Sequence, residues 1–542
     1  MLQNVTTAPT AMDAQDHQNE PLREQRWVKP FSITLLLVGT LSRLAPFTDP
    51  NGRMLRQFMT EDGYLMQTIA RNFALGHGLS VSDGTIATNG TQPLPAFIFA
   101  FFHYLANGNK IGGIAGIAAF SVLVSLASAG LLYSLMKNLL RGQPDGQPLA
   151  LLIASLWFVS PTIVKHSMNG LETGLYFLTS LAMLTLFIRF IDENSSRLSW
   201  KQMILMGLMF GLCFLTRNDA AFLIAATLLA RLILQWPRNA GLWWDRIIEA
   251  VVPGLISVAI ALPWLIYNYR LFGSIEPISG IAEALGAHLG GNLIYLPAVL
   301  LDFITILFPI PPTFETNPLT ILAFFVVLGA ALPLSRKILL SQPRHSTKVA
   351  LLTYGIFGIL LCSFYGVYFG VPFFMSRYLS ILSPILAAVG VTATYRLLTS
   401  TGNVRRVVQA PMMAVALVVA VGLNVRIYRN GLGTYGNFPA VDWVLANVPP
   451  QTWVGAIQTG TLGFFHDRTI NLDGKVNPEA LRARLTEGGV ISYILRTKIQ
   501  YLADWEGLAT WSHSERDGFN QKFKLIVDDK KANLAVFERF NP

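Results

Sequence analysis

The sequence TEDGYLMQTIARN, residues 60–72, lies between the first apolar segment of the chain and a long series of others. Two adjacent carboxylates, Glu61 and Asp62, stand at its start, and Arg71 lies near its end. Two adjacent acids are most often a solvated turn, so the stretch gains meaning only from the segments around it. Those segments decide the fold, because each run long enough to cross a bilayer fixes the side of the next loop.

The composition of the 542 residues is that of a helical membrane protein. Hydrophobic residues make up 52% of the chain and charged residues 13%, whereas soluble domains average about 25% charged residues. The net charge of +10 does not indicate nucleic-acid binding, because the basic residues gather in short loops between apolar segments, as the positive-inside rule describes. Cys213 and Cys362 both lie within apolar segments and are expected to be buried thiols.

The apolar segments predict about eleven membrane crossings, with the N-terminus in the cytoplasm because basic residues at 23–29 precede the first. The expected spans are residues 30–46, 111–136, 148–166, 173–191, 202–216, 218–236, 247–269, 317–335, 348–370, 376–398 and 407–427. The stretch 93–107 is only about 15 residues long, where a crossing needs about 20, and we expect it to lie in the outer interface. We expect 291–310 to be interfacial or re-entrant. In the alternative with thirteen spans, the basic loop at 137–147 would lie outside.

The expected fold is a polytopic α-helical membrane protein with interfacial helices and a small C-terminal α/β domain. Residues 1–29 form a polar cytoplasmic tail, and residues 30–429 form the transmembrane domain with an external loop at 47–91. Residues 430–542 contain no apolar span and lie outside the membrane in this topology. Their alternating segments predict a helix at 478–486 and strands at 453–457, 493–495, 500–503 and 534–538.

The polar residues near the ends of the spans gather on the outer side of this topology. They are Glu61, Asp62, Arg71, Glu172, Arg217, Asp219, Glu276, Glu283, Arg377 and Asn424. Ionisable residues beside membrane segments are costly and usually mark a functional cavity. Simpler explanations exist for single residues: Arg217 could pair with Asp219, and Glu172 could cap the helix that follows it. They do not explain why so many should lie on one side.

A cavity with both signs of charge suits the transfer of a sugar from a lipid carrier. A sugar on a polyprenyl phosphate has an anionic leaving group, and arginine binds phosphate oxygens through a planar fork that stays charged. The acceptor hydroxyl must lose a proton as it attacks the anomeric carbon, so a carboxylate is needed as general base. On a helix, Glu61 and Asp62 would diverge by about 100°, so one could face the acceptor while the other binds a sugar hydroxyl or an arginine.

A series of short motifs occurs in order over roughly residues 30–400. They are EDGY at 61–64 with IARNFALGHGL at 69–79, NGTQPL at 89–94, NGLET at 169–173, LTRND at 215–219, Pro263-Trp264 with Asn268 and Phe272-Gly273, and SRYL at 376–379. In this order the chain resembles the GT-C glycosyltransferases of the protein-mannosyltransferase and aminoarabinose-transferase type. It is most similar to their bacterial relatives, which include mycobacterial terminal arabinofuranosyltransferases.

The resemblance implies an inverting transfer from a polyprenyl-phosphate sugar to a glycan, lipid or protein acceptor, on the outer side of a bacterial inner membrane. The acid pair of the family corresponds to Glu61 and Asp62. Many relatives have an aspartate at the first position, so the glutamate here favours Asp62 as the base, with Glu61 as its rival. The candidate donor and substrate contacts are Arg71, Arg217, Arg377, Glu172, Asp219, Tyr64 and Gln92. The C-terminal domain corresponds to a soluble module on the acceptor side or in gating, and its sequence shows no chemistry of its own.

The sequence shows no metal motif, because its eight histidines are scattered and form no His-x-x-x-His pattern. We therefore expect no cofactor, although some distant members of the superfamily use a divalent ion. Two other functions stay open. A transporter or flippase of lipid-linked saccharides would tend to show internal repeats and broken helices at mid-membrane, and neither is clear. A non-catalytic partner in envelope polysaccharide synthesis is the third.

Overall fold

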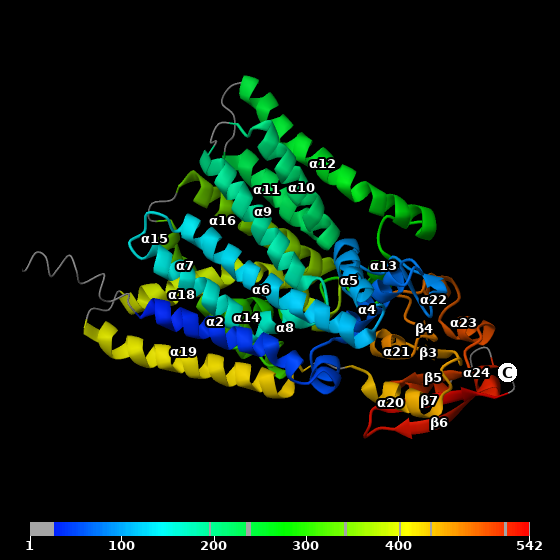
Figure 1. Cartoon of the computed structure of the whole chain (residues 1–542). Helices are drawn as coiled ribbons and strands as arrows, with labels where there is room; N and C mark the ends of the chain where they lie inside the picture. Colours follow the sequence, from blue (N-terminus) through cyan, green and yellow to red (C-terminus); the bar gives the residue numbers. More distant parts are fainter. Residues whose placement is uncertain are drawn as a thin grey trace, which may run out of the picture.

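The computed structural model of the chain describes residues 27–540 except 194–196, 235–239, 341–343, 400–402, 434–435 and 514–517. Most of the tail expected at 1–29 therefore lies outside the described residues. The described chain is a large bundle of helices with a small α/β domain at one end (Figure 1). The expected fold class is confirmed, and the protein is a multi-pass membrane protein.

Helices, most of them apolar, dominate the chain up to Asn430. They are α2 (Val28–Leu44), α3 (Leu55–Gln57), α4 (Glu61–Ala74), α5 (Pro93–Leu105), α6 (Lys110–Leu139), α7 (Gly146–Val159), α8 (Pro161–Met168), α9 (Thr173–Glu193), α10 (Trp200–Thr216), α11 (Ala220–Leu234), α12 (Ala240–Phe272), α13 (Ile278–Ala284), α14 (Leu296–Thr305), α15 (Pro318–Leu339), α16 (His345–Ser363), α17 (Met375–Leu379), α18 (Ser383–Thr399) and α19 (Asn403–Asn430). Within the described ranges, eight helical segments are long and apolar enough to cross a membrane.

Three of the expected spans are not single helices long enough to cross a membrane. Residues 148–166 form α7 and α8, which are bent by 62° at a break just before Pro161. Proline has no N–H to donate and begins a new helix readily. Counted as one crossing, this pair raises the number of spans to nine. The other two are α10 and α11, with 17 and 15 residues, shorter than the roughly 20 residues of a full crossing.

The two stretches expected not to cross form short helices. They are α5 and the segment Leu293–Thr305, both counted among the shorter apolar helices. Their lengths favour the smaller number of spans over the thirteen-span alternative.

The external loop expected at 47–91 contains α4 and a small antiparallel hairpin of β1 (Ser80–Val81) and β2 (Ile86–Ala87). Thr60 caps α4, since its Oγ1 accepts a hydrogen bond from the Gly63 amide at 3.0 Å. Gly63 also allows a close approach, because a Cβ there would lie 2.3 Å from the carbonyl oxygen of Asn169. The first turn of α4 is thereby fixed against the loop that precedes α9.

The C-terminal domain is a five-stranded sheet with helices on both faces. Its elements are α20 (Phe438–Asn447), β3 (Val454–Ala456), α21 (Gly460–Phe465), β4 (Thr469–Asn471), α22 (Pro478–Thr486), α23 (Ile491–Arg496), β5 (Tyr501–Asp504), α24 (Phe519–Lys522), β6 (Phe523–Asp529) and β7 (Leu534–Arg539). The strand order is β4-β3-β5-β7-β6. Strands β4, β3 and β5 are parallel, and β7 and β6 are antiparallel. One apolar cluster packs on each face.

Most of the expected elements of this domain are confirmed: the helix at 478–486 is α22, and three of the four strands are β3, β5 and β7. The strand expected at 493–495 is wrong, because these residues lie in α23, where Tyr493 and Ile494 are buried. Three apolar residues are too few to distinguish the period of a strand from that of a helix.

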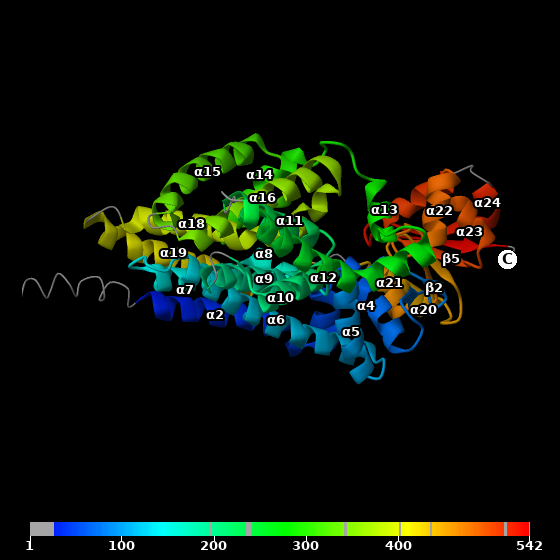
Figure 2. The ribbon, with the colours of Figure 1, turned by 90° about the horizontal axis from the view of Figure 1, so that it is seen from above.

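The C-terminal domain contacts the bundle next to α4 and α13, as both views show (Figures 1 and 2). Helix α21 packs on α4, and α22 packs on α13. Ion pairs join the two parts, among them Arg56 with Asp442 at 2.7 Å and Lys110 with Asp467 at 3.0 Å. The start of α4 therefore lies between the bundle and the domain.

Candidate active site

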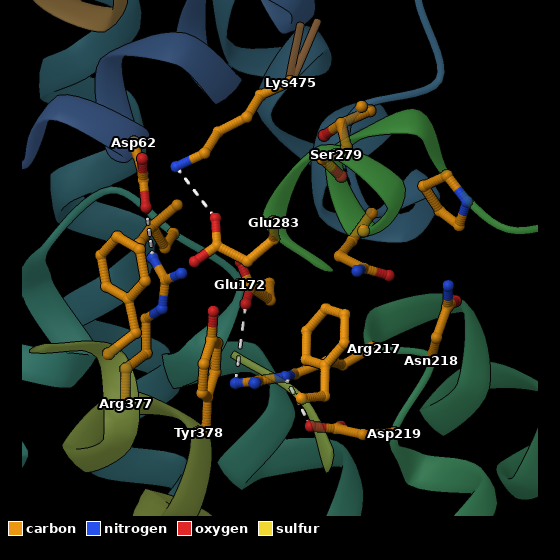
Figure 3. A pocket seen from close by; sticks show the side chains of 18 of the residues that line it. Asp62, Glu172, Arg217, Asn218, Asp219, Ser279, Glu283, Arg377, Tyr378 and Lys475 are labelled. Atoms are coloured by element: carbon orange, nitrogen blue, oxygen red, sulfur yellow. Dashed lines mark hydrogen bonds and ion pairs between the residues drawn. The ribbon is translucent and has the colours of Figure 1, made fainter. Parts of the chain in front are cut away.

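A cavity of about 350 Å³ lies where the bundle meets the C-terminal domain (Figure 3). Its walls come from α4, the turn before α9, the turn between α10 and α11, α13, the segment around α17 and the loop after β4. Charged and polar residues line it together with six aromatic residues whose rings contact one another and which we call the aromatic wall: Phe222, Phe364, Tyr365, Phe369, Phe374 and Tyr378. A cavity of this kind suits a ligand with an ionic head and an apolar part.

Six of the predicted site residues line this cavity: Asp62, Gln92, Glu172, Arg217, Asp219 and Arg377. They come from motifs that lie far apart in the sequence. The motif residue Asn89 helps to build the wall without lining it, because its Oδ1 accepts a hydrogen bond from the Ile278 amide at 3.1 Å. That contact fixes the start of α13.

Asp62 and Arg377 form an ion pair at the edge of the cavity. Arg377 Nη1 donates to Asp62 Oδ2 at 2.8 Å, and Figure 3 shows the two side chains pointing toward each other. Burial alone would raise the pKa of Asp62, but the charges of Arg377 and Lys475 outweigh it and hold the pKa below its usual value. Asp62 is therefore a carboxylate at neutral pH. The Nε of Arg377 is buried and has no hydrogen-bond partner.

Arg217 lies between two carboxylates in the turn that joins α10 and α11. Its Nε is 3.0 Å from Asp219 Oδ2, and its Nη1 is 3.7 Å from Glu172 Oε1. Tyr365 helps to orient the Asp219 carboxylate, since the Tyr365 hydroxyl donates to Asp219 Oδ2 at 2.7 Å. The Oδ1 of Asp219 is buried without a partner. The ion pair of Arg217 with Asp219, which the sequence analysis offered as a simpler explanation of these two residues, is therefore present. Both residues nevertheless line the cavity.

Lys475 is a cavity residue that sequence analysis missed. It comes from the loop between β4 and α22, and its Nζ is 3.1 Å from Glu283 Oε2. The structure therefore places a charged side chain of the C-terminal domain in the cavity, although the sequence of that domain shows no chemistry of its own. No sequence signal marks Lys475, because a lysine in a polar loop of a soluble domain is ordinary and its partner Glu283 belongs to another domain.

The other three predicted residues lie in the contact between the bundle and the domain. Glu61 accepts hydrogen bonds from the amides of Gly460 at 2.5 Å and Thr461 at 3.1 Å, and from the Thr461 hydroxyl. Arg71 pairs with Asp467 at 3.3 Å and donates to the Gly108 carbonyl at 2.8 Å. Tyr64 is buried, and its hydroxyl donates to the carbonyl oxygen of Leu55.

Asn424, which also belonged to the polar outer set, holds helices together. It accepts a hydrogen bond from the Ser42 hydroxyl at 2.6 Å and donates to the Val159 carbonyl at 2.9 Å. It thereby connects α19 with α2 and α7. Buried amides commonly play this part between membrane helices.

The described part of the chain contains no group of three or more His, Cys, Asp or Glu side chains that could hold a metal ion. Four of the five acids that line the cavity instead lie within ion-pair distance of basic residues: Asp62, Glu172, Asp219 and Glu283. The expectation that the protein needs no cofactor stays a prediction.

Two family models match parts of the chain. The model for dolichyl-phosphate-mannose-protein mannosyltransferases matches residues 90–267. A domain of unknown function matches residues 426–535, which cover most of the C-terminal domain. No curated protein sequence matches the chain.

Solved structures share the fold of the whole chain. ArnT from Cupriavidus metallidurans bound to undecaprenyl phosphate is similar with a TM-score of 0.58 and 13% identity, over 95% of this chain and 98% of that one. The oligosaccharyltransferase AglB from Archaeoglobus fulgidus, in complex with an inhibitory peptide and a dolichol-phosphate, gives 0.57 and 14%, over 90% and 70%. At these identities the likeness is one of fold. The fold and the matching mannosyltransferase model place the chain in the GT-C superfamily of membrane glycosyltransferases.

Proposed function

We propose that this protein is an inverting glycosyltransferase that moves a sugar from a polyprenyl-phosphate donor to an acceptor hydroxyl of a glycan, lipid or protein. The reaction takes place at the outer side of a bacterial inner membrane. The observation that carries the proposal is that Asp62, Arg217 and Arg377, from three distant motifs, line one cavity beside an aromatic wall. A carboxylate base and arginine forks are the groups that this transfer needs.

Two arginines of the cavity have guanidinium nitrogens that could donate hydrogen bonds to a phosphate. Arg377 Nε and Arg217 Nη1 are buried and have no hydrogen-bond partner, and charge-assisted bonds from guanidinium groups to phosphate are among the strong ones. The aromatic wall would receive the first apolar units of the lipid. Undecaprenyl phosphate bound to ArnT and dolichol-phosphate bound to AglB support this class of donor.

Asp62 is better placed than Glu61 to act as the base. Asp62 lines the cavity, whereas both oxygens of Glu61 are bound by Gly460 and Thr461. In the free protein the charge of Arg377 makes Asp62 a weak base. A donor phosphate on Arg377 would share that charge, so the basicity of Asp62 would rise when the donor is bound.

In the transfer, the acceptor oxygen attacks the anomeric carbon from the face opposite the phosphate, and its proton passes to Asp62. The bond between the anomeric carbon and the phosphate oxygen breaks, and polyprenyl phosphate leaves with the electron pair. The single displacement inverts the anomeric centre. The basic residues of the cavity stabilise the charge that develops on the leaving phosphate.

The test is transfer in detergent from a panel of polyprenyl-phosphate sugars, comparing wild type with Asp62→Asn and Glu61→Gln. Loss of a general base lowers the rate about 10²- to 10⁴-fold, and we expect that loss for Asp62→Asn, with a smaller loss in Glu61→Gln. Full transfer by both single variants and by the double variant would refute the mechanism. A flippase would instead move lipid-linked sugar across proteoliposomes without an acceptor.

The outer location has its own test. Lys530 is exposed in the C-terminal domain, and Lys201 is exposed at the start of α10, in a loop expected on the cytoplasmic side. A cysteine at position 530 should react with a membrane-impermeant maleimide in intact cells, and a cysteine at 201 only after lysis. The reverse pattern would contradict an outer active site.

A further inference from the structure

We infer that the C-terminal domain is a working part of the active site: Lys475 contacts the donor phosphate, and Glu61 is the positioning residue that holds the domain where Lys475 reaches it. This inference rests on the proposed function, because it takes the donor from there. It gives an active role to a domain that matches a family of unknown function. It also gives Glu61 a role other than base.

The charge balance of the cavity shows why a basic residue from the C-terminal domain matters. Five carboxylates line the cavity, and the basic residues among its lining are Arg217, Arg377 and Lys475. With Lys475, three basic residues face five acids, and without it two arginines would, so its loss would make the lining still more negative toward a phosphate leaving group. Lys475 therefore supplies a third of the positive charge of the lining.

Lys475 points into the cavity between Asp62 and Glu283 (Figure 3). Its side chain is 25% exposed, and that of Glu283 is 10% exposed. Burial would lower the pKa of the lysine, but the carboxylates of Asp62, Glu283 and Asp473 raise it above its ordinary value. Lys475 is therefore an ammonium group, close to the carboxylate that the proposed reaction uses as base.

The loop that carries Lys475 is held on both sides. Within the domain, the Gly474 amide donates to Asn471 Oδ1 at 2.9 Å, and the Lys475 amide donates to Asp473 Oδ1 at 2.8 Å. Toward the bundle, a Cβ on Gly90 would lie 2.1 Å from the carbonyl oxygen of Lys475. The loop therefore presses on the motif that opens α5, and Lys475 reaches the cavity only while the domain stays docked.

Glu61 fixes the docking one residue away from the proposed base. Its carboxylate accepts hydrogen bonds from the amides of Gly460 and Thr461 at the start of α21. The backbones meet as well, because a Cβ on Gly460 would lie 1.8 Å from the carbonyl oxygen of Glu61. The first turn of α4 thus presents one acid to the domain and the next, Asp62, to the cavity. Displacing the domain would withdraw Lys475 from Asp62.

The first experiment measures binding of undecaprenyl phosphate to the purified full-length protein, without any sugar transfer. Removal of one charge-assisted contact weakens binding about tenfold or more, and we expect this for Lys475→Ala, with Lys475→Arg restoring affinity to within a few-fold. Lys475→Ala also removes one of the two cations that lower the pKa of Asp62, so the pKa of Asp62 should rise. In a plot of kcat/KM against pH, the fall in activity on the acid side should therefore begin at a higher pH than in wild type. Wild-type affinity in Lys475→Ala would overturn the inference.

The second experiment separates positioning from contact with two glycines of the same helix. Gly460→Ala must displace α21 from Glu61, whereas a Cβ on Gly463 meets its nearest neighbour at an ordinary 3.8 Å. We expect Gly460→Ala to weaken undecaprenyl phosphate binding and move the fall in kcat/KM on the acid side in the same direction as Lys475→Ala, while Gly463→Ala behaves like wild type. Equal behaviour of the two glycine variants would overturn the role of Glu61.

The two proposals fail separately. A wild type that binds undecaprenyl phosphate but transfers no sugar would refute the proposed function, and the binding comparison would still decide the role of Lys475. A wild type that transfers sugar and loses no affinity in Lys475→Ala would refute only the role of the domain.

Discussion

The cavity and the domain interface beside it both contain acids paired with basic residues, but they use these pairs differently. At the interface, the pairs connect the bundle to the C-terminal domain, as in Arg56 with Asp442, where two nitrogens bind two oxygens and both side chains are about half exposed. In the cavity, Arg377 binds one oxygen of Asp62, and its own Nε is left without a partner.

This difference separates a ligand site from a structural contact better than charge does. A buried polar atom without a partner costs about 1–3 kcal/mol, so native structures contain few of them. Several occur together in this one cavity: Arg377 Nε, Arg217 Nη1, Asp219 Oδ1 and Glu283 Oε1. A bound ligand would complete them, whereas the interface pair of Arg56 and Asp442 is already complete.

The largest expected effect compares a buried cavity pair with an exposed interface pair. Arg217→Met leaves Asp219 and Glu172 without their cation, and breaking a buried ion pair costs about 3–5 kcal/mol. Arg56→Met breaks a pair that is about half exposed, which costs about 0.2–1 kcal/mol. Thermal unfolding in detergent should show a much larger drop in midpoint for Arg217→Met. Equal drops would remove the distinction between the two regions.

The next effect concerns the donor. Arg377→Lys keeps a positive charge beside Asp62 but loses the planar fork, so we expect the donor KM to rise about tenfold or more. Arg71→Lys is the matched control, because Arg71 binds Asp467 and the Gly108 carbonyl outside the cavity. Its donor KM should stay close to that of wild type. A large rise for Arg71→Lys would restore Arg71 to the donor site that the sequence predicted.

The two arginines also show what the sequence can predict. Arg377 and Arg71 both lie near Asp62 in the predicted topology, since alternating spans show which loops share a side of the membrane. The same argument from topology predicted that Glu172, Arg217 and Asp219 lie on the side of the membrane where the cavity is found. Topology alone does not show which of two loops on the outer side a given side chain faces. Arg71 faces Asp467 in the C-terminal domain, and no pattern in the sequence connects these two residues.

The long helices of the fold could be predicted from the sequence, but some details of their geometry could not. Long apolar runs such as α6 and α9 correspond to helices because twenty apolar residues have few other structures available in a membrane. The bend before Pro161 was not foreseen, because it depends on local helix geometry rather than on hydropathy. Lys475 was missed for the same kind of reason: its position depends on how two domains dock.

A smaller effect tests the interface at Glu61. Glu61→Ala removes the acceptor for the amides of Gly460 and Thr461, so their hydrogen exchange should accelerate, and a hydrogen bond to a charged group contributes about 1.5–3 kcal/mol. The control is Glu487→Ala, which breaks a pair with Arg496 inside the C-terminal domain and should leave those amides unchanged. Equal exchange in both variants would contradict the docking contact.

The smallest expected effect is that of Tyr64→Phe, which tests whether Tyr64 belongs to the interface or to the substrate. The hydroxyl donates to the buried Leu55 carbonyl, and the ring packs among Phe438, Phe464 and Phe465 of the C-terminal domain. Phenylalanine keeps the ring packing and loses one hydrogen bond, which contributes about 1 kcal/mol. Thermal unfolding should therefore show a small loss of stability, while the donor KM and the transfer rate stay unchanged. A donor KM that rises as far as in Arg377→Lys, at unchanged stability, would place the Tyr64 hydroxyl on the substrate and extend the cavity toward the domain interface.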